Sequence, residues 1–132
     1  MTHDDKELLL QDISARLPYG VMCNIGLKYP LQLQRIFVDR LDGILLDFYE
    51  DGDNYQVYLS EVKPYLRPMS NMTEEEWTEY QKIRMIDWVN GDINGTFINA
   101  GLIVDWLNKN HFDYRGLIPK GLAFEAPEGM YK

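Results

Sequence analysis

The stretch LQLQRIFVDRLDGILLDFYEDGDNYQVYLSEV, residues 31–62, decides the fold class of this chain. In its first part, LQLQRIF, apolar and polar residues alternate, which is typical of a half-buried strand. The runs GILLDFYE (43–50) and YQVYLSEV (55–62) are rich in β-branched and aromatic residues, which also favours strands. The linker EDGDN between these runs indicates a hairpin loop, because Gly52 and Asn54 tolerate positive φ angles.

A fourth run, GVMCNIGL at 20–27, has the same character. Four short strands between residues 19 and 66 predict a small antiparallel β-meander. Such a sheet reduces its exposed edges by curling, and the expected shape resembles a small SH3-like barrel. The following KPYLRP (63–68) is expected to be extended, because its two prolines resist helix formation.

A helix is predicted before the meander, in DDKELLLQDISARLP (4–18). Its apolar residues recur at helical spacing. Asp4 is the expected N-cap, with Glu7 three residues on as in a capping box. Pro18 disfavours helical geometry at the preceding residue, so the helix is expected to end there.

A second helix begins in NMTEEEWTEY, the strongest local signal in the chain. Thr73 and Glu76 have the spacing of a capping box, and Met72 and Trp77 that of a hydrophobic staple. This helix is expected to continue to about Trp88, where two Asn-Gly pairs interrupt the pattern.

A third helix is predicted in TFINAGLIVDWLNKN (96–110), with Thr96 as its cap. The tail after it contains several Gly and Pro residues and is expected to pack as irregular structure. The predicted fold class is therefore α+β in a single domain, residues 1–132. It comprises a helix at 1–18, the β-meander at 19–66, and two helices with a packed tail at 67–132.

Composition narrows the classes of function. The chain has 132 residues and a net charge of −8, which repels phosphate backbones and argues against direct nucleic-acid binding. Its apolar runs are too short to span a membrane, and its acidic N-terminus is unlike a secretion signal. We therefore expect a cytoplasmic protein without membrane contact.

Acidic residues gather in the predicted hairpin region. Between Asp39 and Glu61, seven acidic residues are accompanied by the single base Arg40. We take the following residues as a candidate acidic patch: Asp39, Asp42, Asp47, Glu50, Asp51 and Asp53.

Motifs for metals and cofactors are weak in this sequence. DGDNYQVYLSEV resembles the start of a calcium loop, but Gln56 stands at the required glycine and Val62 at the twelfth position. One cysteine and two histidines are too few for a zinc site, and no glycine-rich phosphate loop follows a strand. We expect no metal and no cofactor. Cys23 is interpreted as a core residue rather than a nucleophile.

The segment HFDYRGL (111–117) combines more residue types used in catalysis and binding than any other short stretch of the sequence. His111 and Asp113 are candidates for a hydrogen-bonded pair, and Arg115 for an anion contact. The favoured interpretation is an extended segment over the core, with Phe112 and Tyr114 inward and the three polar side chains on the opposite side. In that case Asp113 pairs with Arg115 or accepts backbone N–H groups in the turn before Gly116.

The chain also resembles a family of small uncharacterised proteins from Bacteroidetes gut bacteria and their prophages and mobile elements. The resemblance rests on LPYGV (17–21), VKPYLRPMSNMTEEE (62–76) and DWLNKNHFDYRGLIPKGLAFEAPEGMY (105–131). Family members often carry two adjacent histidines before FDYRGL, where this chain has Asn110 and His111. No activity is assigned to the family, so the resemblance implies a biological context and no chemistry.

The leading hypothesis is a non-enzymatic protein-binding module, an accessory protein of a phage or mobile element. Aromatic residues and arginine are the usual anchors of interfaces. The candidate partner-binding residues are Trp106, His111, Asp113, Tyr114 and Arg115, with Arg67 as a further anchor. One alternative is an acidic mimic of nucleic acid that inhibits a host DNA- or RNA-processing enzyme. A second is a small hydrolase that uses His111 and Asp113. The partner's identity and the oligomeric state, homo-oligomer included, stay open.

Overall fold

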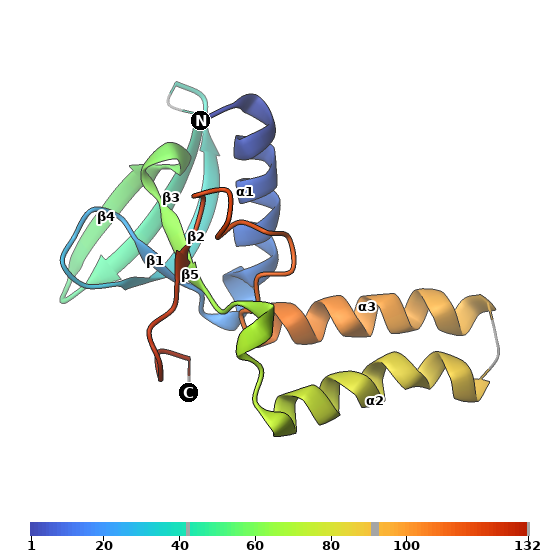
Figure 1. The fold of residues 1–132 in the computed structure, drawn as a ribbon. Helices are drawn as coiled ribbons and strands as arrows, with labels where there is room; N and C mark the ends of the chain where they lie inside the picture. Colours follow the sequence, from blue (N-terminus) through green and yellow to red (C-terminus); the bar gives the residue numbers. More distant parts are fainter. Residues whose placement is uncertain (42, 91–92, 132) are drawn as a thin grey trace.

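The fold is α+β, as predicted (Figure 1). The computed structural model describes residues 1–41, 43–90 and 93–131, with the backbone alone described at 85–90 and 93–99. The helices are α1 (His3–Arg16), α2 (Glu74–Asn90) and α3 (Ile93–Lys109). The strands are β1 (Met22–Asn24), β2 (Leu31–Asp39), β3 (Gly43–Glu50), β4 (Asp53–Tyr58), β5 (Lys63–Leu66) and β6 (Phe124–Glu125).

The strands form one curled sheet in the order β4-β3-β2-β1-β5-β6. All neighbours pair antiparallel except β5 and β6, which are parallel. The sheet is shaped like half a barrel, with β4 and β6 at its two ends, and α1 packs against it (Figure 1). The short β6 comes from the tail, so the last part of the chain completes a sheet that the meander begins.

A β-bulge in β2 sets which side chains face the core. Leu33 pairs with Phe48, but the next pair along is Arg35 with Asp47, so Gln34 is the extra residue. The shift keeps Leu33 and Ile36 on the same side although they are three positions apart. Without the bulge, the period-2 alternation of a strand would place Ile36 on the outer face.

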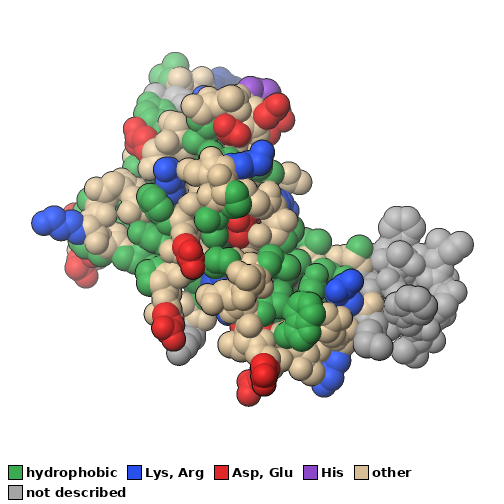
Figure 2. Space-filling model, in the orientation of Figure 1, with side chains coloured by type: hydrophobic (Ala, Val, Ile, Leu, Met, Phe, Trp, Pro, Cys, Tyr) green, Lys and Arg blue, Asp and Glu red, His purple; other side chains and the backbone are tan. Residues whose placement is uncertain are grey.

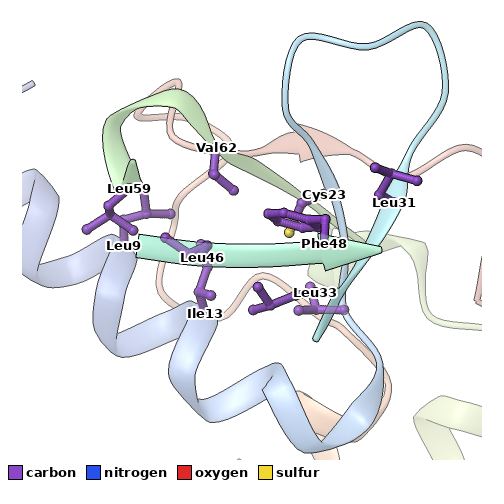
Figure 3. Packing of buried hydrophobic residues seen from close by; sticks show 10 residues of the cluster. Leu9, Ile13, Cys23, Leu31, Leu33, Leu46, Phe48, Leu59 and Val62 are labelled. Carbon is purple, nitrogen blue, oxygen red and sulfur yellow. The ribbon is translucent and has the colours of Figure 1, made fainter. Parts of the chain in front are cut away.

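The main core lies between α1 and the sheet (Figure 3). Leu9 and Ile13 of α1 pack there with Leu46 and Phe48 of β3, and all four are fully buried. Burial of each such side chain contributes about 1.5–3 kcal/mol. Cys23 is buried in the same cluster, which confirms its interpretation as a core residue, and burial raises the pKa of its thiol.

Several local features differ from the predictions. The N-cap of α1 is Thr2. The Thr2 side chain accepts from Asp5 N–H, and the Thr2 N–H donates to the Asp5 carboxylate. The capping box therefore lies two residues upstream of the predicted pair, Asp4 and Glu7. In the β3–β4 turn, Asp51 and Gly52 have positive φ, at 48° and 87°, whereas Asn54 is extended within β4.

The third difference is the start of α3, at Ile93 rather than at the predicted cap Thr96. In addition, the predicted strand 55–62 ends at Tyr58 and continues as a 3-10 turn, Leu59–Glu61.

The start of α2 is as predicted. Glu76 N–H donates to Thr73 Oγ1 at 3.1 Å, and Thr73 N–H donates to a Glu76 carboxylate oxygen at 3.0 Å. Helices α2 and α3 form an antiparallel hairpin that projects from the rest of the molecule, which we call the arm (Figure 1). A 3-10 turn, Met69–Asn71, precedes α2 at the base of the arm.

Candidate functional site

The HFDYRGL segment begins as a helix cap. His111 has a positive φ of 60° and donates its N–H to Asn108 O, while Phe112 N–H donates to Leu107 O. These two bonds form a Schellman motif, in which the left-handed position is usually glycine. Because the chain turns at His111, the predicted alternation is wrong: His111, Phe112 and Asp113 are all buried.

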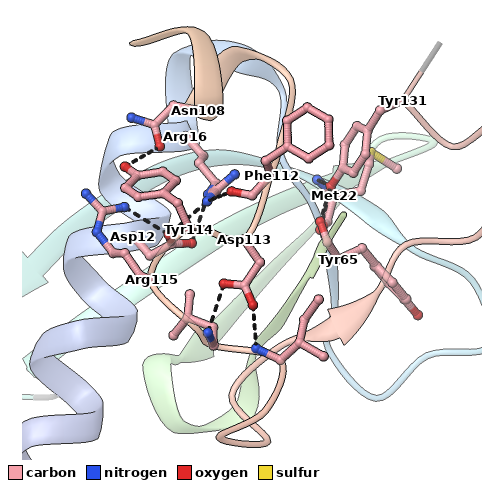
Figure 4. Close-up of polar contacts among 12 residues, drawn as sticks. Asp12, Arg16, Met22, Tyr65, Asn108, Phe112, Asp113, Tyr114, Arg115 and Tyr131 are labelled. Carbon is pink, nitrogen blue, oxygen red and sulfur yellow. Dashed lines mark hydrogen bonds and ion pairs between the residues drawn. The ribbon is translucent and has the colours of Figure 1, made fainter. Parts of the chain in front are cut away.

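The imidazole of His111 is held neutral between the body and the tail. Its Nε2 donates to Tyr19 O at 3.0 Å, and its ring stacks on Tyr131 with centroids 3.8 Å apart. Burial, and secondarily the charge of Arg16, lowers the pKa of His111 to about 4. Tyr131 in turn donates to Tyr65 O at 2.7 Å and accepts from Met22 N–H at 2.9 Å, so this contact fixes the tail to the sheet (Figure 4).

Asp113 binds backbone groups rather than His111. Its two carboxylate oxygens accept from Leu117 N–H at 2.8 Å and Ile118 N–H at 2.9 Å (Figure 4). The predicted alternative of backbone N–H donors is therefore correct, although the donors follow Gly116 instead of preceding it. The segment also pairs with Arg67, whose N–H donates to His111 O and whose carbonyl accepts from Asp113 N–H, both at 2.8 Å.

A buried ion network joins this segment to α1 (Figure 4). Arg16 is fully buried and donates to both carboxylate oxygens of Asp12 and to Phe112 O. Arg115 donates to Asp12 at 2.9 Å, and Tyr114 donates to Asn108 at 2.8 Å. Asp12 and Arg16 were not predicted as site residues from the sequence. Their signal was an acid–base pair four residues apart, beside the apolar positions Leu9 and Ile13 of the predicted helix.

An aromatic chain leads from the segment to the molecular surface. Arg67 lies over the Phe112 ring at 4.2 Å, and that ring stacks on Trp106 at 5.6 Å. Trp106 stacks on Tyr80 at 5.6 Å, and Tyr80 contacts Trp77 at 6.0 Å. Trp106 is only 8% exposed, whereas Trp77 is 52% exposed. Trp106, predicted to bind a partner, is therefore buried, and the tryptophan at the surface is Trp77.

Trp77 borders a groove of about 570 Å³ at the base of the arm, which we call the elbow groove. Its wall is formed by Met69, Ser70, Met72, Thr73, Glu74, Trp77 and Thr78. Met69 and Met72 are half-buried and pack against the aromatic chain. Figure 2 shows hydrophobic side chains gathered where the arm joins the body. Met72 and Trp77 were predicted as a hydrophobic staple but not as part of a surface groove. The exposure of a staple residue depends on what packs around it, and the local sequence does not show this.

A second hollow, of about 560 Å³, lies beside the elbow groove, and we call it the tail cleft. Residues 125–131 of the tail form one wall, and Arg67, Asn71, Thr73 and Glu76 the other. Arg67 makes a two-pronged ion pair with Glu76, at 2.6 and 2.7 Å. The hydrogen bonds from Arg67 are the main reason that the pKa of Glu76 is lowered.

The candidate partner-binding residues therefore meet at one junction, but not as a binding surface. Trp106, His111 and Asp113 are buried, and Tyr114 and Arg115 are half-buried with their polar groups in contact with Asn108 and Asp12.

The candidate acidic patch is likewise divided by the fold. Asp47 is fully buried and pairs with Arg35 at 2.7 Å. Asp39 is half-buried and accepts from Leu41 N–H, and Asp42 lies outside the described residues. Asp51 and Asp53 are exposed at the β3–β4 turn, beside half-buried Glu50.

A metal cluster and a membrane-spanning helix are both absent from the described residues. Within that part of the chain, no three His, Cys, Asp or Glu side chains lie together as a metal site would need. None of the helices, as far as they are described, is long and apolar enough to cross a membrane.

No protein-family model, curated protein or solved structure matches this chain. The resemblance to the Bacteroidetes family therefore stays a prediction.

Proposed function

We propose that the protein is a non-enzymatic protein-binding module and that its partner docks on the elbow groove. The observation that carries this proposal is the half-exposed Trp77, at the outer end of a buried aromatic chain and beside Met69 and Met72. Tryptophan is the residue most enriched among interface hot spots, and methionine adapts to the shape of a partner. From the family resemblance alone, we place the module among the accessory proteins of a phage or mobile element.

Pre-organisation supports the elbow groove as a docking surface. The capping box at Thr73 fixes the first turn of α2, and the Arg67–Glu76 pair ties that turn to the end of β5. The ring of Tyr80 contacts the ring of Trp77 and is itself stacked on the buried ring of Trp106, which restricts the position of Trp77. Binding to a side chain that is already ordered costs little conformational entropy, so more of the contact energy appears as affinity.

The two alternatives receive less support. His111 and Asp113, the residues of the hydrolase hypothesis, are buried, and their side chains bond to backbone groups of Tyr19, Leu117 and Ile118. The nucleic-acid-mimic hypothesis relies on acids that include Asp47, which is buried against Arg35. We therefore propose neither function.

The test is capture of proteins from host lysate by the tagged chain, compared between wild type and Trp77→Ala. The matched control is Tyr49→Ala, because Tyr49 is 49% exposed but lies on the sheet. We expect one protein to be retained at low and high salt by wild type and by Tyr49→Ala, and to be lost with Trp77→Ala. Removal of a hot-spot tryptophan typically weakens binding by about 2 kcal/mol, or roughly 30-fold.

Retention that does not depend on Trp77 would contradict the proposal. If a basic protein is instead retained only at low salt, and is lost when Asp51 and Asp53 are changed to Asn, the acidic-mimic hypothesis gains the support that this one loses.

A further inference from the structure

The elbow groove and the tail cleft lie on the two sides of one short segment. Thr73 lines both hollows, Met69 and Met72 face the first, and Asn71 faces the second. The segment between them is the 3-10 turn and the cap of α2. A partner chain laid across this turn reaches both hollows, since an extended strand advances about 3.3 Å per residue.

The two hollows differ in chemistry. The elbow groove offers the thioethers of two methionines and the ring of Trp77. The tail cleft is bordered by Glu125 and Glu128, and its cation Arg67 is already paired with Glu76. One exposed carboxylate, Glu74 in the first turn of α2, also lines the elbow groove.

The positive end of α2 does not cancel this negative charge. A helix N-terminus is equivalent to about half an elementary charge, which falls off within the first turn. Here Thr73 and Glu76 already occupy two of the free N–H groups. Glu125 and Glu128 come from the tail and add two full charges on the opposite wall of the cleft. The residues that line the two hollows therefore carry more negative than positive charge, with Glu74, Glu76, Glu125 and Glu128 against Arg67, in keeping with the net charge of −8.

From this charge pattern we propose that the occupant is a protein segment with a bulky apolar side chain and a lysine or arginine a few residues away. The apolar side chain fills the elbow groove against Trp77, and the cation enters the tail cleft between Glu125 and Glu128. This inference rests on the proposed function and adds the chemical class of the partner. Charges at the rim of an interface act mainly on recognition and association rate, so the cation selects the partner and the apolar contact retains it.

The test is selection of displayed random 12-residue peptides on the full-length chain, with Trp77→Ala used to remove peptides that bind elsewhere. We expect Trp77-dependent peptides to combine a bulky apolar residue with Lys or Arg. Selection on the double variant Glu125→Gln, Glu128→Gln should remove the preference for Lys and Arg and keep the apolar residue. The double variant Asp51→Asn, Asp53→Asn removes the same charge at a distant exposed turn and serves as the control.

For one selected peptide, affinity to the Glu125→Gln, Glu128→Gln variant should fall by about twofold to thirtyfold, the range for two exposed ion pairs, and not at all for the control. Trp77-dependent peptides without a Lys or Arg preference, or an equal loss in the control, would overturn this inference and leave the proposed function standing. If no selected peptide depends on Trp77, the proposed function fails, and this inference fails with it.

Discussion

The junction around HFDYRGL and the elbow groove have opposite characters. At the junction, charged and titratable side chains such as Arg16, Asp12 and Asp113 are buried and bonded. At the groove, the contacts are apolar and the side chain of Trp77 is half exposed. The comparison teaches that the charged and titratable residues, which suggest catalysis or binding in the sequence, stabilise this fold. The surface suited to a partner consists of apolar residues of the kind usually found in a hydrophobic core.

Among changes to polar side chains, the largest effect is expected from Arg16→Ala, which breaks the junction. This change removes the guanidinium that joins Asp12 to Phe112 O, so that the buried Asp12 keeps its pair with Arg115 and Phe112 O keeps the N–H of Tyr114. Removal of one partner of a buried ion pair typically costs about 3–5 kcal/mol of unfolding free energy. Urea denaturation at pH 7 measures it, with the exposed Arg40→Ala as a control. A loss below about 1 kcal/mol would mean that the network is not a main tie between α1 and the tail.

Asp113→Ala should come next. Two backbone N–H groups, of Leu117 and Ile118, lose their acceptors in a buried turn. We expect a loss of about 2–3 kcal/mol, because unsatisfied buried donors keep their full desolvation cost. Asp113→Asn retains one acceptor oxygen and should lose less. Equal losses for the two variants would show that the charge, and not the turn, matters.

Acid should weaken the junction through His111. Its pKa in the folded protein is lowered to about 4 from the ordinary 6.5, so the unfolded chain takes up the proton first. The stability that neutral His111 contributes is therefore complete above pH 6.5 and is lost as the pH falls towards 4, by about 2 kcal/mol after allowance for partial solvent contact.

Unfolding free energies across this range measure that loss, and His111→Asn supplies the comparison. Asparagine tolerates the left-handed conformation and does not titrate, so its variant should show a flatter slope between pH 6.5 and 4. An unchanged slope would assign the pH dependence to other groups.

Trp77→Ala should have the smallest effect on stability and so sharpens the comparison. The side chain is 52% exposed, and we expect a loss of at most about 1 kcal/mol in urea denaturation. Phe112→Ala, at the buried end of the same aromatic chain, should cost about 3–5 kcal/mol. A large loss for Trp77→Ala would show that its ring serves packing, and the capture experiment would then need Trp77→Leu.

Local signals predicted much of the fold. The bounds of β2 and β3 and the start of α2 follow from alternation, turn residues and a capping box, all of which act within a few residues. Where several local solutions compete, prediction was less accurate. Thr2 and Asp4 both cap helices well, and Thr2 lies at the position that lets Asp5 complete the box.

The site was less predictable than the fold. Met72 and Trp77 carried a readable local signal, but their exposure depends on the angle at which the arm leaves the body. The candidates Trp106, His111 and Asp113 were singled out for side-chain chemistry, and burial assigned them to structure.

The sequence by itself determined the α+β class, the order of helix, meander and helical hairpin, and the core position of Cys23, because periodicity and capping are properties of neighbouring residues. Only the tertiary structure decided the bulge that turns Ile36 inward, the pairing of tail strand β6 with β5, and the meeting of Arg16 with Phe112 across 96 residues. These features depend on contacts between residues far apart in the sequence. The contribution of one residue to such a contact is set by its partner's position in the folded chain, which the neighbouring residues do not determine.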